Sequence, residues 1–279
     1  MALRILVVGS AGMLGRDLTA HLQARHRVIE ADLPDLDITV PQLIEKAVHA
    51  ERPDVVIHTA AFTAVDECER RPDIAFAVNA DGTRNVALAC HHAGVPLLYV
   101  STDYVFDGEK PAPYIEEDAP NPVNVYGRSK FEGEKHVREI VPHAWIVRTS
   151  WLFGPLGKNF VRAILERAER GEPLAVVNDQ VGAPTYTADL AGALEQIVIR
   201  GSPATYHVTN QGYCSWFGFA QEILRQAGLG QVEITPIPTA LSARPAPRPR
   251  NSRLANTRLQ AERLDLLPPW QDALRRYLL

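Results

Sequence analysis

A tyrosine and a lysine four positions apart, Tyr126 and Lys130, have the residue types and spacing that most suggest chemistry in this sequence. On a helix, two such side chains lie on one face, one turn apart. A free tyrosine has a pKa of about 10 and is a weak acid at neutral pH. A nearby ammonium lowers that pKa and makes the phenol a useful proton donor. A solvated helix face gives the same spacing by chance, so the pair indicates catalysis only together with further motifs.

A glycine-rich turn near the N-terminus is the first of these further motifs. The apolar run 5–8 predicts a buried parallel strand, and an amphipathic stretch, 16–24, predicts a helix after the turn. Between them, Gly9 would allow the tight turn, Gly12 the approach of backbone to a pyrophosphate, and Gly15 the packing of helix on strand. The spacing is G-x-x-G-x-x-G, and an ordinary β-α turn is the alternative. The flanking strand and helix favour a dinucleotide site.

An acidic residue, Asp32, follows the second predicted strand, 28–31. It lies about 20 positions beyond the glycines, where an adenosine ribose is held in such folds. Asp32 could bind the ribose hydroxyls, which favours NADH and opposes a 2′-phosphate. A solvated loop acid is the alternative, and Arg16 or Arg27 could accommodate NADPH. The sequence therefore leaves NADH and NADPH open.

The composition is that of a protein with a full hydrophobic core. The chain has 279 residues, 46% of them hydrophobic, which suits one large domain or one domain with a smaller lobe. A net charge of −4 argues against a general nucleic-acid binder. The cysteines Cys68, Cys90 and Cys214 show neither metal spacing nor a disulfide framework. No apolar run approaches the ~20 residues that span a bilayer, and no signal peptide precedes the first strand. We therefore expect a cytoplasmic protein without membrane or nucleic-acid partners.

Predicted strands and helices alternate through the first half of the chain, which indicates an α/β fold with a doubly wound parallel sheet of the Rossmann type. We expect residues 1–150 to form an NAD(P)-binding domain. We expect residues 151–279 to form mainly a smaller C-terminal substrate-binding lobe, interleaved with the last sheet elements. The expected strands are 5–8, 28–31, 55–58, 96–100, 145–148 and 174–177; the expected helices are 16–24, 41–50, 73–93, 124–141, 160–170, 187–200 and 216–227. The stretch 234–250 is too rich in proline for regular structure.

Three segments follow predicted strand ends, where ligands sit in an open parallel sheet. The small residues of 59–63 could let a flat cofactor lie close. Thr102 could bond the same substrate oxygen as Tyr126, although a satisfied hydroxyl at a strand end is the alternative. Trp151 offers a flat surface on which sugar rings stack, with a core tryptophan as the alternative.

The motifs together resemble the dTDP-4-dehydrorhamnose reductase family, within the extended short-chain dehydrogenases/reductases. The glycine turn and the Tyr/Lys pair are typical of the whole superfamily, whereas the segments 101–106, 178–185 and 248–252 are far more specific. The resemblance runs through nearly the whole chain. The matching stretches are 9–15, 63–66, 101–106, 124–130, 148–151, 178–185 and 248–252.

The resemblance implies an oxidoreductase that uses NADPH or NADH to reduce the C4 keto group of dTDP-4-dehydro-L-rhamnose, giving dTDP-L-rhamnose for cell-surface polysaccharide. It implies Tyr126, Lys130 and Thr102 as the catalytic residues. The expected cofactor contacts are Gly9, Gly12, Met13, Leu14, Gly15, Asp32, Asp37, Ile38, Ala61, Phe62, Thr63, Tyr126 and Lys130. The expected substrate contacts are Thr102, Asp103, Trp151 and Arg248.

The proline-rich stretch holds four arginines that could bind the substrate's diphosphate, because guanidinium groups match phosphate oxygens in pairs: Arg244, Arg248, Arg250 and Arg253. The prolines would preorganise the loop, and a solvated basic loop or a peptide-recognition segment is the alternative. Some family members are described as magnesium-linked dimers. The last residues given, Tyr277-Leu278-Leu279, are not acidic, so the sequence does not support Mg²⁺ but leaves both the metal and a homodimer open.

Two other functions remain open at this stage. Epimerases and dehydratases of the superfamily use the same Tyr/Lys pair but return the hydride to the substrate. Dehydratases need an additional acid-base pair near Thr102, and Asp103 is followed by Tyr104 rather than an acid. The regulatory subunit of methionine adenosyltransferase is similar to this family and acts as a binding partner. The intact set of Tyr126, Lys130 and Thr102 argues against that role.

Overall fold

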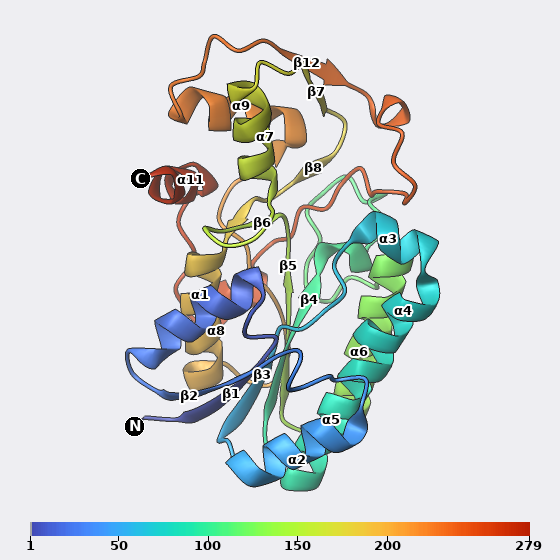
Figure 1. Ribbon diagram of the computed structural model, residues 1–279, viewed down its shortest axis with the longest axis vertical. Helices are drawn as coiled ribbons and strands as arrows, with labels where there is room; N and C mark the ends of the chain where they lie inside the picture. The colour runs from blue at the N-terminus through green and yellow to red at the C-terminus, as the bar shows by residue number, and fades with distance from the viewer. Residues whose placement is uncertain (1) are drawn as a thin grey trace.

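A six-stranded parallel sheet forms the centre of the computed structural model, which describes residues 2–279 (Figure 1). Its strands are β1 (Arg4–Val8), β2 (Arg27–Ala31), β3 (Val55–His58), β4 (Leu97–Thr102), β5 (Ala144–Thr149) and β10 (Thr205–His207). The strand order is β10-β5-β4-β3-β1-β2, and every adjacent pair is parallel. The chain moves to one side after β1 and to the other side from β3 onward. Ligands bind beyond the carboxyl ends of the strands at such a reversal.

Helices cover both faces of this sheet (Figure 1). One face carries α1 (Met13–Gln23) and α8 (Thr187–Arg200), and the other carries α2 (Pro41–Glu51), α5 (Thr83–Ala93) and α6 (Val125–Ile140). Since successive side chains of a strand point to opposite faces, β1 serves both layers. Ile5 and Val7 pack in the cluster with α1 and α8, and Leu6 and Val8 pack in the cluster with α2 and α5. The sheet is therefore buried on both sides, as its continuous apolar strands predict.

A smaller lobe stands beyond the carboxyl ends of the strands (Figure 1). Its helices α7 (Phe160–Glu169), α9 (Trp216–Gln226) and α11 (Trp270–Leu278) share one apolar cluster with β7 (Leu174–Val177). The shorter elements of the chain are β6 (Leu152–Phe153), β8 (Val181–Gly182), β9 (Thr185–Tyr186), β11 (Cys214–Ser215), β12 (Ile234–Ile237), α3 (Val65–Arg70), α4 (Pro72–Phe76), α10 (Thr257–Ala261), the π-helix η1 (Ala77–Gly82) and the 3₁₀-helices η2 (Asp103–Val105) and η3 (Thr239–Leu241).

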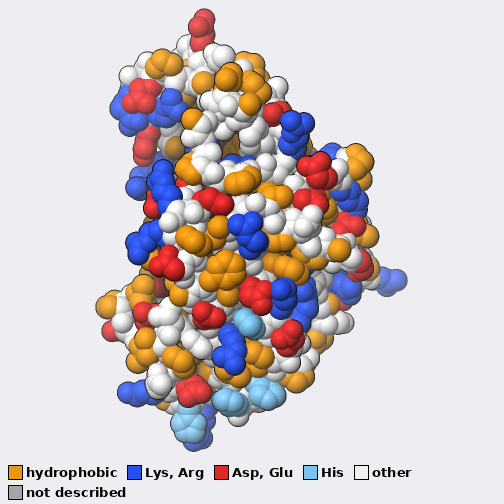
Figure 2. All heavy atoms as spheres, turned by 90° about the vertical axis from the view of Figure 1, so that its right-hand side faces the viewer, with side chains coloured by type: hydrophobic (Ala, Val, Ile, Leu, Met, Phe, Trp, Pro, Cys, Tyr) orange, Lys and Arg blue, Asp and Glu red, His pale blue; other side chains and the backbone are white. Residues whose placement is uncertain are grey.

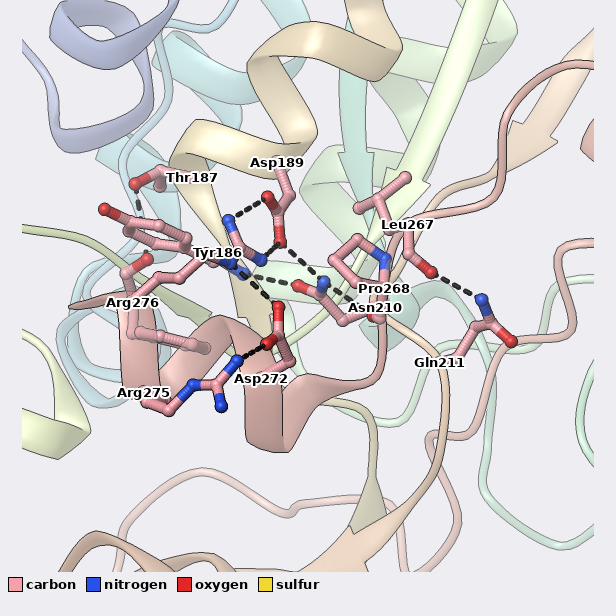
Figure 3. A network of polar contacts seen from close by, with 11 residues as sticks. Tyr186, Thr187, Asp189, Asn210, Gln211, Leu267, Pro268, Asp272, Arg275 and Arg276 are labelled. Atoms are coloured by element: carbon pink, nitrogen blue, oxygen red, sulfur yellow. Dashed lines mark hydrogen bonds and ion pairs between the residues drawn. The ribbon is translucent and has the colours of Figure 1, made fainter. Parts of the chain in front are cut away.

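A polar network fixes the C-terminal helix α11 to α8 (Figure 3). The guanidinium of Arg276 donates to both carboxylate oxygens of Asp189 at 2.7 Å and to Asp272 at 2.9 Å. Asn210 donates to Asp189 at 2.7 Å and accepts from the backbone N–H of Tyr186 at 2.8 Å. These side chains lie far apart in the sequence, and they join α11 of the lobe to α8, which covers one face of the sheet.

The structure differs from the predicted elements in several places, and the helices α3, α10 and α11 and the two-residue strands were not predicted. The expected helix 73–93 contains the π-helix η1, whose interior Asn79 turns its amide to the backbone of Phe62. The expected irregular stretch 234–250 is wrong at its start, because β12 pairs in parallel with β7. Pro236 is tolerated there since a two-stranded edge leaves one side of each strand without a ladder partner. The sixth sheet strand, β10, was not predicted, because three residues are too few for a periodic signal.

Candidate active site

A cavity of about 790 Å³ opens at the carboxyl ends of β1, β3, β4 and β5. Apart from Trp216, its lining residues all come from the first 152 residues of the chain. The predicted site residues that line it are Gly9, Gly12, Met13, Leu14, Gly15, Asp32, Asp37, Ile38, Ala61, Phe62, Thr63, Thr102, Asp103, Tyr126, Lys130 and Trp151. Arg248 is not among the lining residues.

The glycine turn brings bare backbone to the N-terminus of α1. Gly9 has a φ of +88°, and a Cβ there would lie 2.4 Å from the backbone nitrogen of Ala60. A Cβ on Gly15 would lie 2.0 Å from the carbonyl oxygen of Gly9, so only glycine fits. Gly12 is the N-cap residue of α1, and no side chain caps that end. The free N–H groups and the helix dipole at this end match the demands of a pyrophosphate.

Asp32 stands beside this turn at the end of β2. Its carboxylate accepts hydrogen bonds from the backbone N–H groups of Ala11 and Leu33, both at 2.7 Å. Asp37, which also lines the cavity, accepts from the N–H of Thr39 at 2.9 Å. Asp32 therefore anchors the glycine turn and still faces the cavity, which suits contact with ribose hydroxyls.

Asn79 is a buried residue that sequence reasoning missed. Its side-chain amide accepts from the N–H of Phe62 at 2.7 Å and donates to the carbonyl of Phe62 at 3.1 Å. It also donates to Ser129 at 3.0 Å, and Ser129 donates to the backbone carbonyl of Tyr126 at 2.9 Å. One amide thus joins the cavity loop after β3 to α6. The π-helix that holds Asn79 is a feature frequently found at functional sites, but residue pattern alone does not predict it.

Tyr126, Thr102 and Asp103 meet at the end of β4. Burial raises the pKa of Tyr126 above its ordinary value, the Asp103 carboxylate raises it further, and the Thr102 hydroxyl lowers it. Thr102 donates to Asp103 at 2.8 Å and accepts from the backbone N–H of Tyr104 at 3.2 Å. Burial raises the pKa of Asp103 to about 7, and hydrogen bonds from Ser252 and Thr102 oppose that rise. Tyr126 is therefore a fully protonated phenol at neutral pH.

Lys130 is buried one turn further along α6. Its ammonium donates to the carbonyl of Val100 at 2.8 Å and lies 4.1 Å from the ring centre of Tyr99. Burial lowers the pKa of Lys130 to about 7, and the Glu134 carboxylate opposes that effect. The pKa of Tyr126 is raised overall, because desolvation of the phenol outweighs the groups that lower it.

The buried ion pair between Glu134 and Arg148, one helical turn from Lys130, was also not predicted from the sequence. Glu134, one turn after Lys130, is fully buried and receives two hydrogen bonds from Arg148 of β5, at 2.9 and 2.8 Å. Ser101 donates to the same carboxylate at 2.6 Å. The end of β4 is thereby fastened to α6 at Val100 and at Ser101, on the two positions that precede Thr102.

Trp151 lines the cavity but is not an open platform. Its backbone has a φ of +48°, and its indole stacks on Trp216 with ring centres 3.5 Å apart and planes 10° from parallel. A Cβ on Gly182 would lie 2.5 Å from the same indole. One face of Trp151 is therefore covered by Trp216, and a ligand meets a wall made by both indoles. Trp216 comes from the lobe and was not predicted as a site residue.

The described residues, 2–279, contain neither a candidate metal site nor a helix suited to cross a membrane. Within residues 2–279 there is no group of three or more His, Cys, Asp or Glu side chains that could hold a metal ion. Over the same residues, no helix has both the length and the apolar composition that crossing a membrane requires. Acidic and basic side chains are mixed over the helix-covered face that Figure 2 shows, in keeping with the modest net charge.

Comparisons with known proteins agree over nearly the whole chain. The family model described as "RmlD substrate binding domain" matches residues 3–279. The dTDP-4-dehydrorhamnose reductase of Streptomyces griseus is 43% identical over 278 residues, which cover 97% of this chain and 91% of that protein.

Solved structures give the same relationship. The dTDP-4-dehydrorhamnose reductase of Bacillus anthracis, in complex with NADP, has a TM-score of 0.96 and 39% identity, and the match covers 99% of both chains. The dTDP-4-dehydrorhamnose reductase of Clostridium acetobutylicum has a TM-score of 0.96 and 41% identity, covering 99% of this chain and 98% of that one. The chain therefore belongs to the RmlD substrate binding domain family, the dTDP-4-dehydrorhamnose reductase family that its sequence motifs predict.

Proposed function

We propose that the protein uses NADPH or NADH to reduce the C4 keto group of dTDP-4-dehydro-L-rhamnose, giving dTDP-L-rhamnose. The observation that carries the proposal is that Tyr126, Thr102 and Lys130 line the same cavity as the glycine turn. The proposed proton donor, Tyr126, and the turn that would bind a pyrophosphate therefore line the same cavity. The reductases of Streptomyces griseus and Bacillus anthracis, similar over nearly their whole length, support this substrate.

The residues of the cavity fit a nicotinamide dinucleotide. In this proposal Gly12, Met13 and Leu14 hold the pyrophosphate at the start of α1, and Asp32 holds the adenosine ribose. Ala61, Phe62 and Thr63 lie along the dinucleotide, together with Asp37 and Ile38. When bound, the nicotinamide supplies the hydride for the ketone, and the protein supplies geometry and a proton.

The proton comes from Tyr126 in this proposal. As negative charge grows on the carbonyl oxygen, that oxygen becomes far more basic than a phenolate, so a phenol with a raised pKa can still protonate it. Thr102 orients the same oxygen with its hydroxyl. Lys130 binds ribose hydroxyls of the nicotinamide half and keeps positive charge near the reacting oxygen. Protonation during the transfer prevents an unpaired alkoxide from accumulating.

The finer organisation is also part of this proposal. Residues 1–150 would bind the dinucleotide, and residues 151–279 would mainly supply the substrate lobe, with α8 and β10 returning to the sheet layers. The resemblance suggests a homodimer. Light scattering of the purified protein would support the dimer by a mass of two chains and refute it by a mass of one.

A cofactor-oxidation assay with dTDP-4-dehydro-L-rhamnose, run with NADPH and NADH in turn, tests the function. We expect one cofactor oxidised for each dTDP-L-rhamnose formed. Conversion of the keto sugar to an isomer or a dehydrated sugar, without net cofactor oxidation, would indicate an epimerase or dehydratase, which recycle their cofactor. Absence of turnover with this and other nucleotide-linked keto sugars, together with capture of a partner enzyme, would favour the regulatory role.

A further inference from the structure

The segment 244–252, which contains the Arg-Pro-x-Asn-Ser motif, packs against the start of α6, the helix that carries Tyr126. It does not line the cavity. Figure 1 shows the chain after β12 descending from the lobe toward α3. Its backbone at Pro249 and Arg250 packs so closely on Gly108 that a Cβ on that glycine would lie 2.5 Å from the Cβ of Pro249. None of these residues lines the cavity.

The guanidinium of Arg248 is already occupied within the protein. It donates to Asp66 of α3 at 2.7 Å and to the carbonyl of Ala246 at 2.7 Å. The Asp66 carboxylate also accepts from the N–H of Ala246 at 3.2 Å. The Arg248 side chain is only 13% exposed, and its charge is balanced by a partner whose pKa the pairing lowers to about 2. The slight exposure of Arg248 and the pairing of its charge with Asp66 both disfavour a phosphate at this guanidinium.

Arg248 reaches the catalytic candidates through Tyr104. Burial raises the pKa of the Tyr104 hydroxyl, and the nearby Arg248 guanidinium lowers it. The Tyr104 ring meets the Tyr126 ring edge-on, with centres 5.9 Å apart and planes at 78°. The backbone N–H of Tyr104 donates to the Thr102 hydroxyl at 3.2 Å. Tyr104, which lies near Arg248, therefore touches both groups that would meet the substrate oxygen.

The same segment also holds the start of the helix that carries Tyr126. Asn124 donates to the carbonyl of Pro247 at 2.9 Å and accepts from the N–H of Gly127 at 2.7 Å. Asn124 is thus the N-cap of α6 and a link to the segment. A Cβ on Gly127 would lie 2.0 Å from the carbonyl oxygen of Tyr104, so helix and Tyr104 are in direct backbone contact.

We propose that Arg248 is a positioning residue, which acts through Tyr104 to hold Tyr126 and Thr102 at one oxygen, and that it does not bind the substrate's diphosphate. This inference rests on the proposed function, since it concerns the same reaction. A small misplacement of oriented groups slows a reaction more than it weakens binding. A positioning role therefore predicts a lower kcat with unchanged binding, whereas a diphosphate-binding role predicts weaker binding with unchanged kcat.

The test measures kcat, KM and the dissociation constant of dTDP alone for Arg248→Met, Tyr104→Phe and the double variant. We expect Arg248→Met to lower kcat by about 10- to 100-fold, with the affinity for dTDP changed less than about two-fold. The double variant should be no slower than Arg248→Met, because both changes break one chain of contacts. Arg225→Met is the control, since Arg225 pairs with Glu222 at 2.6 Å, away from Asp66 and Tyr104, and its side chain is 68% exposed.

Asp66→Asn decides the question even where Arg248→Met does not fold. For a positioning role, loss of the pair lowers kcat and leaves dTDP binding unchanged. Tighter dTDP binding in Asp66→Asn, or at least about a ten-fold weaker dTDP affinity with unchanged kcat in Arg248→Met, would overturn the proposal. Unchanged kcat in both variants would overturn it as well. An inactive wild-type enzyme would refute the proposed function instead, and the dTDP affinities would still test the excluded phosphate role.

Discussion

The ammonium of Lys130 donates a hydrogen bond to the carbonyl oxygen of Val100, 2.8 Å away. Val100 lies on β4, two residues before Thr102. This bond draws the cation toward the sheet, while the neighbouring Ser101 is held by Glu134 at 2.6 Å. The strand end and the helix α6 are therefore locked in one register. Thr102 and Tyr126 are brought together by that register, so Lys130 has a structural role in addition to its proposed chemical one.

The activity should fall as Lys130 loses its proton. Burial lowers the pKa of Lys130 from its ordinary value, so the cation is present below about pH 7 and is lost as the pH rises through that value. We expect kcat/KM to fall by about ten-fold per pH unit on the alkaline side. Lys130→Arg should be slower overall but lack this fall, because guanidinium stays charged. A flat wild-type profile across that range would contradict the assignment.

Removing the hydroxyl of Tyr126 should stop turnover without removing the cofactor. We expect Tyr126→Phe to lower kcat by about 10²- to 10⁴-fold, since the variant cannot supply the proton. The dissociation constant of NADPH, measured by calorimetry, should stay near the wild-type value. Tyr213→Phe is a matched control, because Tyr213 lies away from the cavity and donates to the carbonyl of Leu254. A Tyr126→Phe variant with ordinary kcat would remove Tyr126 from the mechanism.

Asp32 should influence the choice between the two nicotinamides. Its carboxylate faces the cavity, so it can accept hydrogen bonds from ribose hydroxyls and repel a 2′-phosphate. We expect Asp32→Ser to weaken NADH binding by about ten-fold, the loss of a hydrogen bond to a charged group, and to spare NADPH. Asp35→Ser, in the same acidic loop but outside the cavity lining, should change neither. Equal losses for both nicotinamides would point to collapse of the glycine turn that Asp32 also anchors.

The stacked pair of Trp151 and Trp216 should shape the substrate side of the cavity. We expect Trp216→Ala to raise the KM of the nucleotide sugar by about 3- to 10-fold, the value of a lost aromatic stack, with a smaller effect on kcat. The near-ultraviolet circular dichroism of the coupled indoles should weaken in the same variant. Trp216→Phe keeps a ring against Trp151 and should restore most of the affinity. An unchanged KM after loss of the stack would limit Trp216 to packing.

Local signals in the sequence were enough for the parts of the site that lie at strand ends. The apolar run before Gly9 and the four-residue spacing of Tyr126 and Lys130 each depend on neighbours in the chain, and both lie on the expected elements. Thr102 follows the same rule because the carboxyl ends of parallel strands share one edge.

The supporting groups could not be predicted in this way, because their roles depend on contacts between distant segments. Glu134 meets Arg148 across a helix and a strand, and Trp216 reaches Trp151 from the lobe. Arg248 is a different case. Its residue type suggested a phosphate ligand, whereas the structure places Asp66 against it. A side chain's type indicates what it can bind, and only the fold decides which partner is near.

Transfer of deuterium is the measurement that tests the central claim most directly. NADPH deuterated at the transferred position should be incubated with dTDP-4-dehydro-L-rhamnose and the wild-type protein, and the product examined by nuclear magnetic resonance. We predict one deuterium at C4 of dTDP-L-rhamnose for each cofactor oxidised, and no labelled product with Tyr126→Phe on the same time scale. Product without deuterium at C4, or formed without net cofactor oxidation, would contradict the proposed reduction.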